Sequence, residues 1–228
     1  PVSATELEPA VIDSVNVIGA GRVGSAVTAR LAERGVELRA DAGLVLLCVP
    51  DSAIAEVARR IEPGPWVAHV SGATPLAALE PHSRRFSVHP LQTFTKSRGA
   101  EQLDGAWAAV TADSGEGRAL GFELAELLGL RPFELADASR RLYHAGAAIA
   151  SNYLVTLQRA ASRLFERAGA PPEALVPLMT RTIENGFELT GPIARGDWAT
   201  VDAHVAAIHE AAPELEPMYL ALAEATRP

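Results

Sequence analysis

The first 135 residues alternate between short apolar runs and amphipathic stretches. Runs of about four to eight aliphatic and β-branched residues are typical of buried strands, and apolar positions spaced three and four apart are typical of helices. The runs predict strands at 15–18, 44–49, 66–70, 86–88, 107–111 and 131–135. The amphipathic stretches predict helices that end near residues 35, 61, 80 and 128. This alternation predicts a mostly parallel, doubly wound α/β sheet.

The pattern changes after residue 135. From 138 to 168 the helical period is uninterrupted, with one broad apolar face formed by Leu142, Ala145, Ile149, Leu157, Leu164 and Phe165. A second helix is predicted from Pro171 to about Leu189, and two more, separated near Pro213, follow a loop at 190–197. We therefore expect an α/β domain at 1–135, which opens on a polar lead-in at 1–14, and an all-helical domain at 136–228.

The chain between the first helix and the strand at 44–49 is too short for a complete repeat of the α/β pattern. Residues 36–40 are compatible with a short second strand, after which only Asp41 and Ala42 precede the next strand. A βαβ unit needs about 30 residues. The sequence therefore predicts a sheet domain that is shortened by about one βα unit.

A glycine-rich segment joins the first strand to the first helix. Gly19, Gly21 and Gly24 form the pattern Gly-x-Gly-x-x-Gly at this junction, which is where a dinucleotide-binding fold requires it. The first glycine allows a tight turn, the second lets a pyrophosphate approach the backbone, and the third lets the helix pack closely on the strand. The amide groups at the start of the helix then face the anion. The alternative is a glycine-rich turn without a ligand.

The adenosine side of this site is less complete. A dinucleotide fold has an acidic residue about 20 positions on, which binds the ribose, and Asp41 lies near that position but in a connector. We therefore expect weak binding of NADP or NAD, with intact pyrophosphate contacts and poor adenosine contacts. The candidate cofactor-binding residues are Gly19, Gly21, Arg22, Val23, Gly24, Val49, Pro50 and Ser71.

Composition narrows the class of protein. The 228 residues carry a net charge of −8, which argues against a nucleic-acid or membrane-surface partner. The single cysteine, Cys48, lies in an apolar strand and excludes a disulfide framework, and no metal site is expected at His204 and His209. No apolar run approaches the length of about 18 residues that spans a membrane, and no signal peptide is visible. We expect a cytoplasmic protein.

Several motifs occur together in a fixed order. They are Gly19-x-Gly21-x-x-Gly24, Ser71-Gly72, His89-Pro90-Leu91-Gln92-Thr93-Phe94, Tyr143-His144, Ser151-Asn152 and the segment 190–197. The chain resembles Rossmann-like proteins with a C-terminal DUF2520 domain of unknown function. That family is similar in plan to 6-phosphogluconate dehydrogenase-like enzymes, pyrroline-5-carboxylate reductase and ketopantoate reductase. The resemblance implies a nicotinamide dinucleotide in the first domain, a substrate pocket between the domains and a homodimer built through the helical domain.

His89 is the first candidate for proton transfer. It follows a strand and precedes a proline, so it lies where open α/β sheets bind ligands. Its ordinary pKa of about 6.5 suits acid–base chemistry. The alternative is a histidine that only holds its own loop.

In several related dehydrogenases the long helix carries Lys-x-x-x-Asn with lysine as the acid. Here Ala148 stands four residues before Asn152, and His144, two turns before it on the same face, is the candidate substitute. Asn152 is a further catalytic candidate, and the alternative is that it binds the backbone of the other domain.

The remaining candidates are polar residues of loops and turns. Ser71 lies at the end of a strand, and either a catalytic role or a helix cap fits it. Gln92 and Arg195 are candidate substrate-binding residues, since an arginine binds a carboxylate through two hydrogen bonds. Asp197 fits a structural pair with Arg195 or a cap of the helix that begins at Trp198.

Two classes of function fit these residues. The first is an NAD(P)-dependent reductase of a small oxo acid or imine, with His89 or His144 as proton donor. The second is a non-catalytic protein that binds a dinucleotide or a phosphate ligand on the same fold. The missing lysine and the shortened adenosine side favour the second class, and the polar residues expected in the pocket favour the first.

Overall fold

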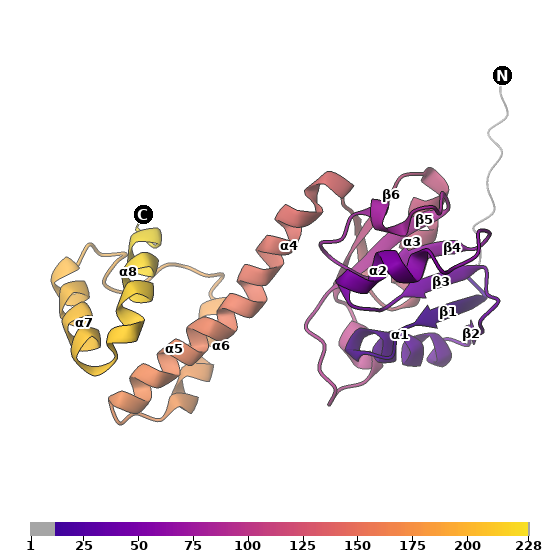
Figure 1. Ribbon diagram of the computed structural model, residues 1–228. Coiled ribbons are helices and arrows are strands. Elements are labelled where there is room, and N and C mark those ends of the chain that lie inside the picture. The colour runs from indigo at the N-terminus through magenta and orange to yellow at the C-terminus, as the bar shows by residue number, and fades with distance from the viewer. Residues whose placement is uncertain (1–11, 228) are drawn as a thin grey trace, which may run out of the picture. The chain divides into compact units, whose positions relative to one another are not determined.

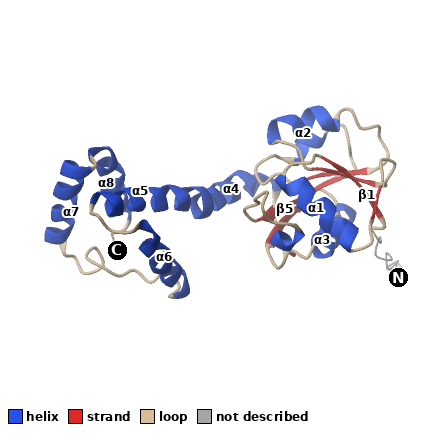
Figure 2. Cartoon of the chain, turned by 90° about the horizontal axis from the view of Figure 1, so that it is seen from below, coloured by secondary structure: helices blue, strands red, loops and turns tan. Residues whose placement is uncertain are grey.

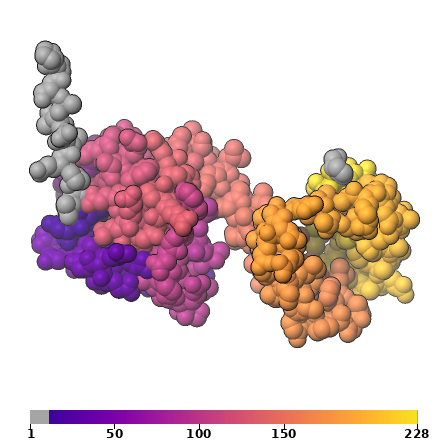
Figure 3. Space-filling view, turned by 180° about the vertical axis from the view of Figure 1, so that it is seen from behind, coloured from indigo at the N-terminus to yellow at the C-terminus, as the bar shows by residue number. Residues whose placement is uncertain are grey.

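The structure is a computed structural model that describes residues 12–227 (Figure 1). Residues 1–11 of the predicted polar lead-in lie outside the described part. The chain divides into two compact units at the bond between Ala148 and Ile149. The second unit is coloured from orange to yellow in the space-filling view (Figure 3). The first unit holds a sheet and the second is helical, which confirms the predicted fold class.

The sheet has seven strands in the order β2-β1-β3-β4-β5-β6-β7. Their bounds are β1 Ser14–Ile18, β2 Glu37–Leu38, β3 Leu44–Leu47, β4 Trp66–His69, β5 Arg85–Leu91, β6 Trp107–Ala112 and β7 Arg131–Glu134. The chain runs outward from β1 to β2 and then returns to place β3 on the other side of β1. The point where the strand order reverses therefore lies between β1 and β3, and open α/β sheets bind ligands at such a point.

Helices cover both faces of the sheet. α1 (Arg22–Glu33) and α3 (Gly115–Leu127) lie on one face, and α2 (Asp51–Ala58) lies on the other (Figure 2). Alternate residues of the central strands divide between two apolar clusters: Leu46 and Phe86 pack with α1 and α3, while Val45 and Val67 pack with α2. The central strands β3 and β4 are buried on both faces, as a doubly wound sheet requires.

The second strand is as short as the sequence predicts. β2 contains two residues and pairs in parallel with β1, where Ser14 lies opposite Glu37. No helix lies between β2 and β3, because the connection from Arg39 to Gly43 is too short for a crossover. The sheet domain therefore lacks one βα unit.

One strand pair departs from the parallel arrangement. β5 and β6 are antiparallel, with His89 opposite Ala109, while β6 and β7 are parallel. The link between β5 and β6 contains only the short 3-10 helix η2 (Ala100–Leu103), which packs against α1. The connection from β4 to β5 is equally long, contains only the 3-10 helix η1 (Leu76–Leu79) and joins parallel strands, so the length of the link does not set the direction of β6.

The long helical segment after the sheet is continuous but not uniform. It begins with η3 (Asp137–Ser139) and α4 (Arg140–Ala148), passes through a π-helical turn at Ile149–Tyr153, and continues as α5 (Leu154–Arg167). Gly169, with a φ of 72°, ends it. Single π turns inside α-helices are frequent at functional sites, and this one contains Asn152.

The remaining helices complete the second unit. They are η5 (Pro172–Ala174), α6 (Leu175–Glu184), α7 (Trp198–Ala211), η6 (Pro213–Leu215) and α8 (Glu216–Ala225). α6 ends before the predicted Leu189 because Gly186 and Phe187 adopt left-handed backbone conformations, with φ of 68° and 61°. No helix among residues 12–227 is both long and apolar enough to cross a membrane.

Candidate functional site

The glycine loop between β1 and α1 has the geometry that its sequence predicts. Gly19 has a φ of 117°, and a Cβ there would collide with the Cys48 carbonyl oxygen, just beyond β3. A Cβ on Gly24 would collide with the Gly19 carbonyl oxygen. Both positions therefore require glycine, one for the turn and one for close packing of the helix on the loop.

Gly21 differs from the other two glycines. A Cβ at this position would meet nothing within 4 Å, so the space beside its backbone is open. Gly21 is also the N-cap of α1, no side chain caps this helix, and its first turn contains no acidic residue. The first amide groups of a helix have no partner within the helix and attract anions. Arg22 and Val23 begin this helix, so the loop fits a pyrophosphate.

The strands beside the loop bring further predicted residues to the same edge of the sheet. Val49 and Pro50 follow β3, and Pro50 precedes the first residue of α2. Asp51 is that first residue, with Pro50 as the N-cap. Ser71 follows β4, which pairs in parallel with β3. Because the carboxyl ends of parallel strands share one edge, these residues lie on the side of the sheet that binds ligands.

Arg39 and Asp41 follow the short strand β2, where the sequence predicts the adenosine side of the site. Arg39 directly follows β2, and its Nε lies 3.4 Å from Asp41 Oδ1 while its Nη1 lies 3.6 Å from Glu37 Oε2. All three side chains are exposed. Sequence reasoning noted the acid and missed the arginine, although its place at the end of the short strand was a usable signal.

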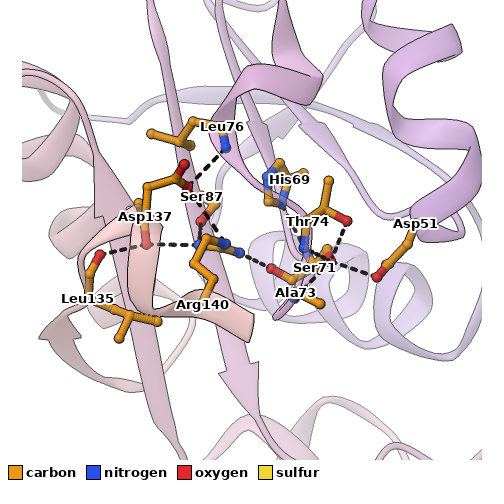
Figure 4. A network of polar contacts seen from close by, with 11 residues as sticks. Asp51, His69, Ser71, Ala73, Thr74, Leu76, Ser87, Leu135, Asp137 and Arg140 are labelled. Carbon is orange, nitrogen blue, oxygen red and sulfur yellow. Dashed lines mark hydrogen bonds and ion pairs between the residues drawn. The ribbon is translucent and has the colours of Figure 1, made fainter. Parts of the chain in front are cut away.

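Ser71 is enclosed by hydrogen bonds. Its hydroxyl donates to Asp51 Oδ2 at 2.8 Å and accepts from the Thr74 amide at 3.0 Å and the Ala73 amide at 3.3 Å (Figure 4). The side chain is buried and ties the turn after β4 to the start of α2. These contacts are those of a residue that stabilises a turn.

Arg140, which sequence reasoning missed, is the largest fully buried side chain described. Its Nη1 donates to Ser87 Oγ at 2.6 Å and to Thr111 Oγ1 at 2.8 Å, and its Nη2 donates to the Ser71 carbonyl oxygen (Figure 4). The nearest carboxylate is that of Asp137, at 4.0 Å from Nε. Arg140 thus fixes the start of α4 to three parts of the sheet, and burial lowers the pKa of its guanidinium.

His89 lies beside this arginine and inside β5, which runs on to Leu91, so the expectation that His89 follows a strand ending at residue 88 is wrong. Pairing with β6 extends the strand through His89, which lies opposite Ala109.

His89 Nδ1 is 2.8 Å from the Tyr143 hydroxyl, and the two rings meet edge to face with centroids 5.5 Å apart. The His144 ring is 6.1 Å away. A Cβ on Gly72 would lie 2.8 Å from His89 Nε2 and 2.7 Å from His144 Cδ2. The two imidazoles therefore converge on Gly72, and only glycine leaves them room.

The pKa values of His89 and Tyr143 differ strongly from their ordinary values. Burial, followed by the charges of His144 and Arg140, lowers the pKa of His89 to about 4, against a smaller opposing effect of Asp51. Burial raises the pKa of Tyr143 to about 12. Both groups are therefore neutral at pH 7. Within the described residues, the hydrogen bond of His89 is made by Nδ1, and Nε2 faces Gly72 without a hydrogen-bond partner.

A further histidine, His69, packs beneath the turn that contains Ser71. His69 is fully buried on β4, and its Nδ1 accepts the Ser71 amide at 3.2 Å. Its Nε2 makes no hydrogen bond of normal geometry within the described residues. Burial, followed by the charges of Arg140 and His89, lowers the pKa of His69 to about 3, and the Pro75 carbonyl opposes this. His69 is neutral and fills the core behind Ser71.

The other predicted site residues lie in the loop after β5 or in the second unit. Gln92 follows β5 and holds its loop, since its side chain accepts the Thr93 amide and donates to the Gln102 carbonyl oxygen. Asn152 and Arg195 are exposed residues of the second unit. Asp197 accepts from the Thr200 amide at 3.2 Å and caps α7. No cluster of three metal-ligating side chains occurs within residues 12–227.

The chain matches the model of the DUF2520 family, a domain of unknown function, over residues 106–226. This match covers more than half of the sequence. The protein belongs to the DUF2520 family. No curated protein matches it.

Solved structures resemble this DUF2520 protein over most of their length. A proposed NADP oxidoreductase, BF3122 from Bacteroides fragilis, has a TM-score of 0.77 at 22% identity, covering 93% of this chain and 97% of that one. Protein TM1727 from Thermotoga maritima has a TM-score of 0.73 at 23% identity, with coverage of 92% and 95%. A reductive aminase from Aspergillus terreus, solved with NADPH and ethyl levulinate, has a TM-score of 0.64 at 14% identity, with coverage of 94% and 92%. The shared feature is the fold of Rossmann-type NAD(P) oxidoreductases.

Proposed function

We propose that this DUF2520 protein is an NAD(P)-dependent reductase of a small oxo acid or imine. The observation that carries the proposal is the placement of His89. A neutral imidazole with a free nitrogen lies at the same edge of the sheet as an uncapped helix start that fits a pyrophosphate. A reductase needs these two features together, a dinucleotide cradle and a proton donor.

The cofactor binds through the glycine loop in this proposal. Gly19 and Gly24 shape the loop, Gly21 leaves space for the anion, and Arg22 and Val23 supply amides from the first turn of α1. Val49, Pro50 and the turn at Ser71 border the path along the strand ends. When bound, a reduced nicotinamide supplies the hydride. The solved reductive aminase that shares the fold was crystallised with NADPH, which supports the same cofactor class.

The adenosine side decides between the two cofactors. Arg39 suits the 2′-phosphate of NADP, and Asp41 suits the ribose hydroxyls of NAD. The two side chains now pair with each other, so either ligand has to replace that contact. The two-residue β2 offers little further surface. We therefore propose weak dinucleotide binding, in which the pyrophosphate supplies most of the affinity.

His89 is the proposed proton donor, with His144 beside it as the alternative. Reduction places negative charge on the substrate oxygen or nitrogen, and a group at hydrogen-bond distance has to protonate it. The hydrogen bond of His89 within the described residues uses Nδ1, which leaves Nε2 for the substrate in this proposal. In the same proposal Gln92 and Arg195 bind substrate, with the arginine taking a carboxylate, and Asn152 is a further catalytic residue.

A homodimer formed through the second unit completes the proposal. Large apolar side chains are exposed on its helices, among them Val176 (57% exposed), Leu178 (60%) and Ile183 (52%) on α6, and Tyr153 (59%) on the π turn. Monomeric proteins rarely expose a large contiguous apolar surface. Light scattering at micromolar concentration is expected to give twice the chain mass, and a monomer would contradict the dimer.

A dinucleotide- or phosphate-binding protein without catalysis is the second candidate. This candidate is favoured because Ala148 stands where related dehydrogenases have a lysine as proton donor. The two-residue β2 also shortens the proposed adenosine side. Calorimetric titration with NADPH and NADH, followed by an NADPH oxidation assay with pyruvate, glyoxylate, 2-oxobutyrate and 1-pyrroline, distinguishes the two. Oxidation with one acceptor supports the reductase. Binding without oxidation by any acceptor supports the second candidate.

A further inference from the structure

We propose that Tyr143 fixes the tautomer of His89 and relays the proton that His89 donates. The proton relay rests on the proposed reductase function, whereas the tautomer of His89 does not depend on any cofactor or substrate. The contact that carries the proposal is the 2.8 Å hydrogen bond between the Tyr143 hydroxyl and His89 Nδ1.

Tyr143 is held rigidly in this position. It lies three residues after Arg140 on α4, and residues three apart share one face of a helix. Arg140 donates hydrogen bonds to Ser87 on β5 and Thr111 on β6, which lie opposite each other. Ser87 is two residues before His89 on the same strand. The Tyr143 ring also packs against Phe133 on β7, with centroids 6.0 Å apart. The sheet therefore determines where the hydroxyl points.

Two neutral groups allow either direction of this hydrogen bond, and we infer that Tyr143 donates because its hydroxyl has no other acceptor among the described residues. A neutral imidazole has one N–H group and one nitrogen with a free lone pair. A phenol that keeps its proton donates it to that lone pair, and His89 Nδ1 is the partner that the Tyr143 hydroxyl has. The imidazole proton then resides on Nε2. This nitrogen faces Gly72 and presents a donor, as protonation of a reduced carbonyl or imine requires.

The proposed relay balances its protons. When the substrate atom becomes negative, the His89 Nε2–H bond breaks and a new O–H or N–H bond forms on the substrate. At the same time Nδ1 takes the phenol proton, which leaves a phenolate on Tyr143 and avoids an imidazolate. The buried charge of Arg140 lowers the pKa of Tyr143 against the effect of burial, so it stabilises this phenolate. A proton from water then enters at Nε2, and Nδ1 returns its proton to the phenolate.

The chain contains a second histidine–tyrosine pair that serves as a matched control. His204 Nδ1 lies 2.8 Å from the Tyr219 hydroxyl, and the ring planes meet at 87°, the same angle as in the first pair. His204 is exposed and belongs to α7 of the second unit. Replacement of Tyr219 by phenylalanine removes the same bond without touching the cluster on the sheet.

The experiment records long-range ¹H–¹⁵N spectra of histidine-labelled protein at pH 7, without cofactor, with His89→Gln to assign the signals. Wild type is expected to show His89 protonated at Nε2 and unprotonated at Nδ1. In Tyr143→Phe, the Nδ1 signal is expected to shift to that of a nitrogen without a hydrogen bond, with a growing share of the other tautomer. Phenylalanine keeps the ring contacts, so the variant should fold. Tyr219→Phe is expected to leave the His89 signals unchanged.

Two results would overturn the proposal. The first is a wild-type His89 that carries its proton on Nδ1. The second is a Tyr143→Phe spectrum in which both His89 nitrogen signals are unchanged. Because no cofactor or substrate is present, the outcome does not depend on the reductase proposal, which fails separately if NADPH oxidation is absent.

Discussion

The two histidine–tyrosine pairs have the same hydrogen bond but very different surroundings. His89 and Tyr143 lie on the sheet unit beside a buried arginine, a second imidazole and a glycine that only just leaves them room. His204 and Tyr219 link two helices at the surface of the other unit. The bond length and the angle between the rings do not distinguish the pairs. The pairs differ in burial, in neighbouring charge and in position, because only the first lies on the sheet, beside the proposed ligand site.

The largest expected effect tests whether that edge binds the dinucleotide. Gly21→Val places a side chain in open space, so the fold is expected to persist while NADPH binding is abolished, because the anion can no longer approach the amides of α1. Gly115→Val is the matched control, since Gly115 also begins a helix, has open space around it and follows Ser114, which already caps α3. Calorimetry measures both variants. Equal binding by Gly21→Val and wild type would remove the glycine loop from the site.

The next largest expected effect distinguishes His89 from His204. His89→Ala is expected to lower turnover by about 10²-fold or more, the usual scale for loss of a general acid. His204→Ala is expected to leave turnover unchanged, because its pair lies in the helical unit. NADPH oxidation is measured after circular dichroism has shown that both variants are folded. Full activity in His89→Ala with loss in His144→Ala would transfer the role of proton donor to His144.

Burial of His89 and of the neighbouring His69 also predicts a loss of folding stability in acid. The pKa of His89 is about 4 and that of His69 about 3, both below the ordinary 6.5, so the unfolded chain binds more protons between these values. Stability is therefore full above pH 6.5 and falls as the pH decreases. Each histidine is expected to cost about 2 kcal/mol at pH 5. Urea unfolding at pH 7 and pH 5 measures the loss, and His89→Gln should remove about half of it. An equal loss in the variant and wild type would exclude His89 as a source.

The smallest expected effect concerns the proposed adenosine side at Arg39 and Asp41, in contrast to the proposed pyrophosphate side at the glycine loop. Arg39→Ala is expected to weaken NADPH about tenfold and NADH little, since it removes the partner of the 2′-phosphate. Asp41→Ala should weaken NADH and spare NADPH. Titration of each variant with each cofactor gives the four affinities. Identical ratios in the two variants would show that neither residue selects the cofactor.

Local patterns explain why much of the fold was predictable. The glycine spacing and the short stretch between α1 and β3 are visible within about 30 residues, and both the loop and the missing unit follow from them. Burial of the strands follows from their apolar composition. The antiparallel β6 and the π turn at Asn152 were not predictable, because strand direction depends on how a loop folds and the π turn leaves the apolar period nearly unchanged.

The polar partners of the site were beyond the reach of sequence reasoning. Tyr143 is 54 residues from His89, and Arg140 is 53 residues from Ser87. Hydrophobic periodicity reports which face of an element is buried and carries no information on such distant hydrogen bonds. The candidate His89 was identified from its place after a strand, whereas the residues that set its charge and tautomer required the structure.

Transfer of deuterium from [4,4-²H₂]NADPH, which carries the label at both C4 positions, to an acceptor tests the central claim most directly. The acceptors are pyruvate, glyoxylate, 2-oxobutyrate and 1-pyrroline, and mass spectrometry of the products measures the label. The account predicts that wild type places deuterium on the carbon of at least one acceptor, and that His89→Ala places about 10²-fold less in the same time. Bound NADPH with no deuterium in any product would contradict a reductase and leave this DUF2520 protein a dinucleotide-binding protein.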